Sequence, residues 1–325
     1  MFHRCLSVLA LVAAAAAGRA LDPIPFLPAE TDAVITIQAK QLAESALMQK
    51  VGPDLLKTLL KSSKQAAEAL EATGLDPMKD FDRIVVGVDA DKTDPPKPFA
   101  LLEGKFDIKK VTAAVDDYMA KNPTKVSAIK VLDKPAYKIT GKNDAETMYS
   151  AVISDTLLVV APSEYALAGA FEAAAGSRKA VISKELAGVI AGTKSTAPIF
   201  VQAWVKGKFA SLNVPNEQLK QRLQGVDWAT ASVTVTKDMA INAVINTPDA
   251  AAAKQLSDLL GGVVLLLKLQ AAAAAEDQPE LKFLVDLLRT TRVNPKDKTV
   301  VVTGLVHGSD IEKAMKAEAA APKKK

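Results

Sequence analysis

The order of strand and helix patterns is repeated along this chain, and this repeat limits the folds open to it more than any other feature. Two similar α+β halves are predicted, over residues 31–178 and 195–318. In each half a strand precedes a helical stretch, two strands, a second helix, and further strands that lead into a last helix. The β-branched strand 33–37 corresponds to strand 198–204, and a Gln-Ala pair accompanies both. Each half ends with an apolar strand followed by a serine and an acidic residue, which is the pattern of a helix start.

Most predicted strands follow one another as hairpins, with helices between the hairpins. The paired patterns at 83–88 and 99–104, and at 229–236 and 240–245, are typical of antiparallel strands. A doubly wound parallel sheet would require strand and helix to alternate singly, and they do not. The sequence therefore predicts an α+β fold of mostly antiparallel sheet with helices packed on one face. It leaves open whether the two halves share one sheet or form two domains.

The stretch after the first strand has apolar residues at helical spacing from Leu47 to Leu70. It predicts one long helix, or two helices joined near Gly52, with Pro53 in a first turn.

Both ends of the chain are predicted to lie outside the fold. Residues 1–20 have a positive start and an apolar run that is too short to span a bilayer, which is typical of a secretory signal peptide cut near Ala20. The protein is therefore predicted to be secreted or periplasmic. Residues 21–30, with three prolines, are expected to form an extended spacer, and residues 319–325 a disordered basic tail.

Removal of the signal peptide leaves few reactive side chains. Cys5 and His3 lie within it, so the mature chain would have no cysteine and one histidine, His307. This excludes disulfides, thiol nucleophiles and zinc–thiolate sites. The whole chain has 41 Lys and Arg against 37 Asp and Glu, and two arginines are lost with the signal peptide, which leaves a net charge of +2. A nearly balanced charge does not favour nucleic acid as a partner.

Patterns that resemble catalytic or nucleotide-binding motifs fail in spacing or context. Residues 188–195 resemble a phosphate-binding loop, but the glycines are one residue too close and the segment leads from a helix to a strand. Ser127 and Lys130 match Ser-x-x-Lys, but in a strand they would lie on opposite faces. Only His307 could serve a Ser/His/acid triad, and no Gly-x-Ser-x-Gly motif accompanies it. No catalytic or cofactor-binding residue is therefore assigned, and no cofactor is expected.

An acidic cluster after the first long helical stretch contains the candidate metal ligands. Asp76, Asp80 and Asp82 carry the carboxylates that calcium prefers. Their spacing matches no EF-hand loop, and the run Gly-Leu-Asp-Pro at 74–77 is typical of a helix end followed by a turn. The turn is the preferred interpretation, so no metal is assigned.

The most apolar helical stretch covers residues 259–275. Lys268 and Gln270 interrupt it before it reaches a membrane length, so no transmembrane segment is predicted in the mature chain. The stretch is interpreted either as a buried core helix or as one wall of an apolar groove. The candidate lining residues of that groove are Leu259, Val263, Leu266 and Leu267.

Residues 73–87 carry the run Thr-Gly-Leu-Asp-Pro followed by Asp-Phe-Asp-Arg. Together with residues 28–34 and 102–107, they resemble uncharacterised secreted bacterial proteins of domain-of-unknown-function families. In those families a signal peptide precedes a strand, a long helix, this turn and a hairpin. The resemblance implies export and a duplicated α+β body, and it supplies no catalytic residue.

These observations predict an exported, non-catalytic binding or scaffold protein. Its partner is expected to be an envelope protein or a hydrophobic ligand. Two alternatives are kept. One is a periplasmic carrier of a lipid, with residues 259–275 lining its cavity, and the other is a carboxylate-dependent hydrolase that uses residues among Asp76 to Asp94.

Overall fold

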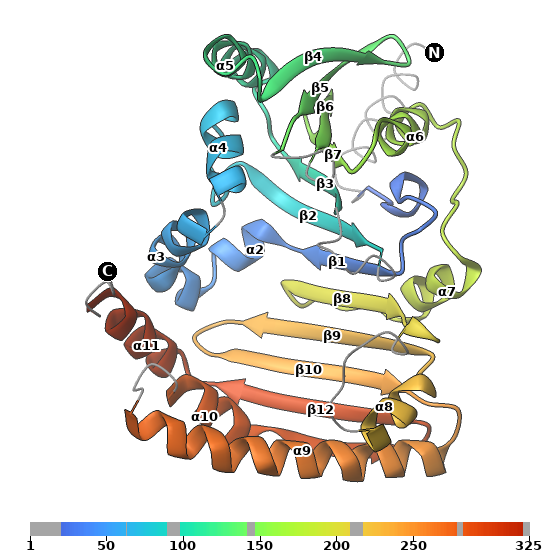
Figure 1. Cartoon of the computed structure of the whole chain (residues 1–325), viewed down its shortest axis with the longest axis vertical. Helices are drawn as coiled ribbons and strands as arrows, with labels where there is room; N and C mark the ends of the chain where they lie inside the picture. The colour runs from blue at the N-terminus through green and yellow to red at the C-terminus, as the bar shows by residue number, and fades with distance from the viewer. Residues whose placement is uncertain are drawn as a thin grey trace, which may run out of the picture.

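The structure, a computed structural model, describes residues 21–62, 64–89, 98–141, 147–208, 217–277 and 282–320 (Figure 1). The predicted signal peptide lies outside the described residues. The proline-rich segment after it is not an extended spacer. It forms the 3₁₀ turn η1 (Ile24–Phe26), and Phe26 and Leu27 are buried because they cover apolar strands. At the other end, the last helix runs to Ala320, two residues into the predicted tail.

All strands of the described chain belong to one open sheet, in which every neighbouring pair is antiparallel. The α+β class and the antiparallel sheet are therefore confirmed. In sheet order the strands are β11 (Arg292–Lys296), β12 (Thr299–Val306), β10 (Met239–Asn246), β9 (Trp228–Val235), β8 (Ile199–Trp204), β1 (Ala33–Ile37), β2 (Phe81–Val88), β3 (Phe99–Gly104), β7 (Leu157–Ala161), β6 (Met148–Ser154), β5 (Lys134–Ile139) and β4 (Val126–Val131).

A pair of strands from the two predicted halves, β1 and β8, lies at the centre of this order. From it the strands follow β1-β2-β3-β7-β6-β5-β4 in one direction and β8-β9-β10-β12-β11 in the other. Residues 31–178 and 195–318 therefore share one continuous sheet. The two directions contain seven and five strands, and the internal repeat stays a prediction.

Ten helices accompany the sheet in the described chain. They are α2 (Ala39–Ala43), α3 (Ala46–Ser62), α4 (Lys64–Thr73), α5 (Ile108–Lys121), α6 (Glu164–Ala174), α7 (Lys184–Gly192), α8 (Glu217–Gln224), α9 (Ala250–Asp277), α10 (Lys282–Thr290) and α11 (Gly308–Ala320). Helix α3 continues through Gly52 and Pro53, so the predicted junction there is wrong. Burial of Leu47 and Val51 in the same helix outweighs the hydrogen bond that the proline cannot donate.

Helices cover both faces of the first-half strands; in the second half α7 covers β8 on one face, and α8, α9 and α11 cover the other face of the sheet. Residues paired across antiparallel strands share a face. Val85, Leu101 and Val159 are such partners, and η1, α6 and α7 cover them. The opposite face of the whole sheet packs against α2 and α5 in the first half and against α8, α9 and α11 in the second. The one-face expectation therefore holds for β9, β10, β11 and β12, whereas β1, β2, β3 and β7 are apolar on both sides and are covered on both.

Candidate functional site

An open groove of about 750 Å³ lies between α8 and α9. Helix α9 forms one wall and packs on β11 and β12 through an apolar side that includes Ala253 and Leu256. Helix α8 forms the other wall, where Leu219 and Leu223 pack against the same apolar cluster. Because both helices are fixed by their inner sides, their outer sides are left to form the groove.

The structure places three of the four candidate lining residues in this groove. Leu259, Val263 and Leu266 line it, at helical spacings of four and three. Leu267 does not line it, because one residue further along a helix points about 100° away. Its side chain is 43% exposed.

Polar side chains also line the groove, and the apolar pattern of residues 259–275 does not predict them. Gln218, Gln221 and Arg222 share one face of α8, and Gln255 and Asp258 recur at helical spacing with Leu259. That shared spacing is the signal by which they could have been found. No ion pair or side-chain hydrogen bond engages these five groups in the described part of the chain, so they are free to bind a ligand.

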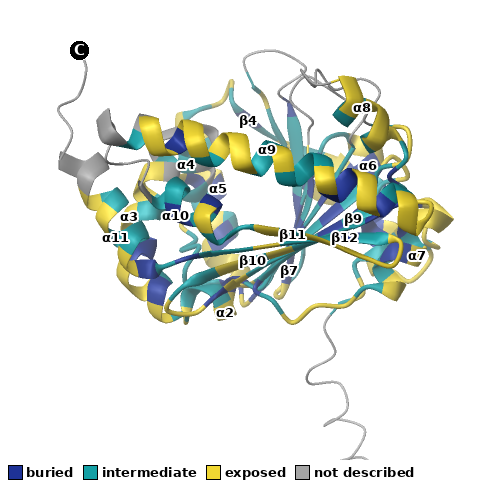
Figure 2. Ribbon diagram, turned by 90° about the horizontal axis from the view of Figure 1, so that it is seen from below, coloured by how far each residue is buried: buried dark blue, intermediate teal, exposed yellow. Residues whose placement is uncertain are grey.

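Helix α9 exposes a leucine face made of Leu265, Leu266 and Leu269, and Leu267 is exposed on another side of the helix. The four residues are 59%, 55%, 66% and 43% exposed in that order, whereas Lys268 is partly buried. Figure 2 shows that much of α9 is exposed. Just 17% of the apolar stretch Ala250–Ala273 is buried. The interpretation of α9 as a buried core helix is therefore wrong. Alanines and leucines in the first turns of α9 pack against the sheet. The later leucines are left exposed to solvent.

Among the described residues, α9 is also the one helix that is long and apolar enough to cross a membrane, judged by length and composition. In the structure it is packed along β11, β12, α8 and α10 as part of the fold.

The candidate calcium ligands belong to a compact turn between α4 and β2. The backbone N–H of Asp76 donates to Asp80 Oδ2 at 2.7 Å, and the N–H of Met78 donates to Asp76 Oδ1 at 2.9 Å. Lys79 Nζ lies 2.8 Å from Asp76 Oδ2, and this contact lowers the pKa of Asp76. Asp82 is exposed on β2 and takes no part in these contacts. The turn therefore uses two of the three carboxylates for its own backbone. Asp91 and Asp94, part of the hydrolase alternative, lie outside the described residues.

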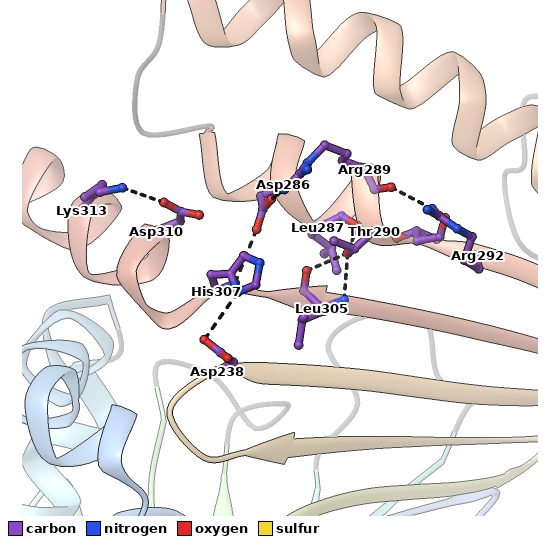
Figure 3. Close-up of polar contacts among 11 residues, drawn as sticks. Asp238, Asp286, Leu287, Arg289, Thr290, Arg292, Leu305, His307, Asp310 and Lys313 are labelled. Atoms are coloured by element: carbon purple, nitrogen blue, oxygen red, sulfur yellow. Dashed lines mark hydrogen bonds and ion pairs between the residues drawn. The ribbon is translucent and has the colours of Figure 1, made fainter.

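His307 lies at the end of β12 between two aspartates (Figure 3). Its backbone N–H donates to Asp286 Oδ2 at 3.4 Å, and its Nδ1 is 3.7 Å from Asp238 Oδ1. Asp238 also accepts the N–H of Gly308 at 3.0 Å, and Arg289 pairs with Asp286 at 2.5 Å. The Arg289 guanidinium lowers the pKa of Asp286 against the opposing effect of burial. These contacts fix α10, α11 and the β9–β10 turn to β12.

No hydrogen bond of the described chain joins His307 to a serine or threonine hydroxyl, so a Ser/His/acid triad is not assembled there. Residues 188–195, which resemble a phosphate-binding loop in sequence, form the end of α7 and the three residues after it. The buried Gln202 side chain donates to the carbonyl of Thr193 at 2.8 Å and to that of Ile190 at 3.3 Å. The run is thus closed by a strand side chain rather than open to phosphate.

No group of three or more His, Cys, Asp or Glu side chains within the described ranges is arranged to hold a metal ion. Comparison with protein-family models, with curated proteins and with solved structures finds no match.

Proposed function

We propose that this chain is an exported, non-catalytic binding protein whose binding surface is the α8–α9 groove with the adjoining leucine face. The observation that carries this proposal is the exposure of Leu265, Leu266 and Leu269 on a helix that the rest of the fold already holds in place. A contiguous apolar surface on a folded protein marks a site of contact with a partner, a ligand or a membrane. Unengaged polar groups beside it supply the donors and acceptors that fix a bound molecule.

The carboxylates of the acidic turn and of the junction at His307 support binding rather than catalysis. Asp76 and Asp80 serve their own turn, and Asp286 serves a helix junction. A catalytic carboxylate needs an open position beside the substrate, which these groups do not have. The hydrolase alternative therefore has less support than the binding protein.

The shape of the groove favours a partner bound at the surface over an enclosed lipid. Five of the nine lining residues are polar, and the groove is open to solvent rather than enclosed. A cavity that encloses an acyl chain is lined predominantly by apolar side chains. We therefore place the carrier alternative second. Export remains part of the proposal and rests on the predicted signal peptide.

The proposal also includes a mature chain without a membrane-spanning segment, because α9 is held in the fold by its contacts with the sheet.

Binding of an apolar fluorescent probe tests the proposed groove. N-phenyl-1-naphthylamine should bind the chain without residues 1–20 saturably, with a rise in fluorescence. Leu266→Gln and Arg222→Ala should each weaken binding, the first by about tenfold, because an apolar wall is lost. Leu132→Gln is the matched control, since Leu132 in the β4–β5 turn is 55% exposed, as is Leu266.

Probe binding that is unsaturable, or equally reduced by Leu132→Gln, would argue against the groove as the site. The carrier alternative makes a separate prediction. Native mass spectrometry of protein from its own envelope should then show a co-purified lipid, and a clean apo mass would remove that alternative.

A further inference from the structure

The hydrogen-bond ladder between β5 and β6 stops before either strand ends. It ends at the pair of Tyr137 and Ser150, although β5 begins three residues before Tyr137 and β6 continues for four residues after Ser150. Thr140 N–H donates to the Lys125 carbonyl at 2.7 Å, so every second residue from Thr140 back along β5 directs its backbone towards β4. Pro135, five positions before Thr140, therefore faces β6, and it has no N–H to donate. The missing donor ends the ladder and leaves the ends of the two strands unpaired with each other.

A pocket of about 380 Å³ opens at these unpaired strand ends. The strand ends form one wall, and Phe171, Ala174 and Ala175 at the end of α6 form the other. The register of β6 against β7 also shifts after Val152, so Ile153, which lines the pocket, lies in a β-bulge. Bulges are enriched beside functional sites, where they re-aim a side chain. Two irregularities of the sheet therefore meet at one pocket.

Lys134 is the one charged side chain among the described residues that line this pocket. Its Nζ lies 5.0 Å from the centroid of the Phe171 ring, and Phe171 itself is buried. No carboxylate pairs with Lys134 in the part of the chain that the structure describes, and the carboxylates nearest in sequence to the lining, Asp133, Asp155 and Glu172, are exposed. The ammonium group therefore lies beside an apolar pocket without a counter-charge, which a bound carboxylate would supply.

The end of α6 limits which anions fit beside Lys134. The helix ends at Ala174, and the partial negative charge of its last carbonyls stabilises a cation there but opposes a free anion. An anion therefore needs a second source of affinity, and the apolar wall of Phe171 and Ile153 supplies it. The pocket volume is near the lower end of the range for small-molecule sites, so the apolar part of the ligand is small.

We propose that this pocket binds a small apolar monocarboxylate, with the carboxylate at Lys134 and the apolar chain against Phe171 and Ile153. The two contacts act together, because neither the ammonium group nor the apolar wall alone selects this class of ligand. The site shares no lining residue with the α8–α9 groove, so it does not depend on the function proposed for that groove.

Isothermal titration of octanoate into the chain without residues 1–20 tests the proposal. Octanoate should bind saturably at one site, acetate should not bind, and octanol, which has the same chain and no charge, should bind about tenfold more weakly than octanoate. Lys134→Met keeps an apolar stem and removes the ammonium group, so it should weaken octanoate binding by about tenfold and leave octanol binding unchanged. Ala175→Leu should weaken the binding of both, because a longer side chain fills the pocket. Lys109→Met, at an exposed position of α5 outside the pocket, is the matched control and should change neither.

No binding of octanoate at millimolar concentration, equal binding of octanol and octanoate, or full octanoate binding by Lys134→Met would overturn the proposal. So would octanoate binding that Arg222→Ala weakens and Lys134→Met does not, because the ligand would then occupy the α8–α9 groove. Melting curves show whether each variant is folded. Lys134 is exposed, so its variant keeps the test valid if Ala175→Leu does not fold.

Discussion

Trp204 of β8 lies directly opposite Trp228 of β9 in the antiparallel register, and Trp204 also packs against the apolar core of the first-half strands. Both tryptophans of the chain therefore lie between residues 195 and 318. The four tyrosines lie between residues 31 and 178. The tyrosines thus report on the first of the two stretches that β1 and β8 join into one sheet, whereas the tryptophans report on the second stretch and, through Trp204, on its junction with the first.

We expect the two stretches to unfold together, because β1 of the first stretch and β8 of the second are paired by backbone hydrogen bonds at the centre of the sheet. In a urea titration, tryptophan fluorescence and the second-derivative absorbance of tyrosine should give the same midpoint. Two clearly separated midpoints would show that the stretches unfold independently.

Gly308→Ala is expected to destabilise the junction of β12 and α11. A Cβ at this position would lie 2.0 Å from the carbonyl oxygen of Lys237, so the backbone must move. We expect the free energy of unfolding to fall by about 3 kcal/mol. Gly188→Ala is the control: it lies within α7 with open space around it, and there alanine should stabilise the helix by up to about 1 kcal/mol. Urea denaturation measures the stability of both variants. Equal changes in the free energy of unfolding would contradict the close approach of Gly308 to the Lys237 carbonyl.

Asp286→Asn should reduce stability at neutral pH and make stability less sensitive to acid. The pKa of Asp286 is lowered in the folded state by Arg289, so its stabilising effect is present above the unfolded-state pKa of about 3.9 and is lost as the pH falls through the lower folded-state pKa. Asparagine does not titrate. Urea midpoints at about pH 7 and about pH 3 should therefore differ less in the variant than in the parent.

The exposed pair of Asp117 and Lys121 on α5 provides the control, since Asp117→Asn should change neither midpoint by more than a surface pair contributes. An acid-induced fall as large in Asp286→Asn as in the parent would disprove the assignment to Asp286.

The acidic turn offers a matched comparison of two neighbouring aspartates. Asp80→Ala removes the acceptor for the N–H of Asp76 and should lower the free energy of unfolding by about 1 kcal/mol. Asp82→Ala, at an exposed position, should change it by less than about 0.5 kcal/mol. Thermal melts measure the stability of both variants. A larger loss of stability in Asp82→Ala than in Asp80→Ala would contradict the hydrogen bond assigned to Asp80.

Calcium at millimolar concentration should not shift the melting temperature, because the oxygens of Asp76 are engaged by Met78 and Lys79. A rise in melting temperature that Asp80→Ala abolishes would instead identify the cluster as a calcium site.

Local signals in the sequence predicted local structure well. The serine and acidic residue that follow the last strand of the first half predict a helix start, and Ser163 accepts a hydrogen bond from the backbone N–H of Ala166 in α6. The hairpin pattern predicted antiparallel strands in the same way, because a short connection between two strands fixes their direction.

Features that depend on distant packing were not predictable from local patterns. The pairing of β1 with β8 joins residues more than 160 positions apart. The burial of Phe26 and Leu27 depends on strands that an extended segment would not contact. Apolar periodicity located α9 but not its orientation, because which side faces the sheet is set by the fit of small residues such as Ala253, not by hydrophobicity alone.

The central claim is that the outer side of α9 binds a partner. Incorporation of the photo-crosslinker benzoylphenylalanine at position 266, and in a separate variant at position 132, tests it most directly, because the parent side chains are equally exposed. On irradiation in intact cells of the source organism, position 266 should give discrete adducts, identifiable by mass spectrometry as one class of lipid or protein, and position 132 should give none. No adduct at 266, or the same adducts at both positions, would contradict the account.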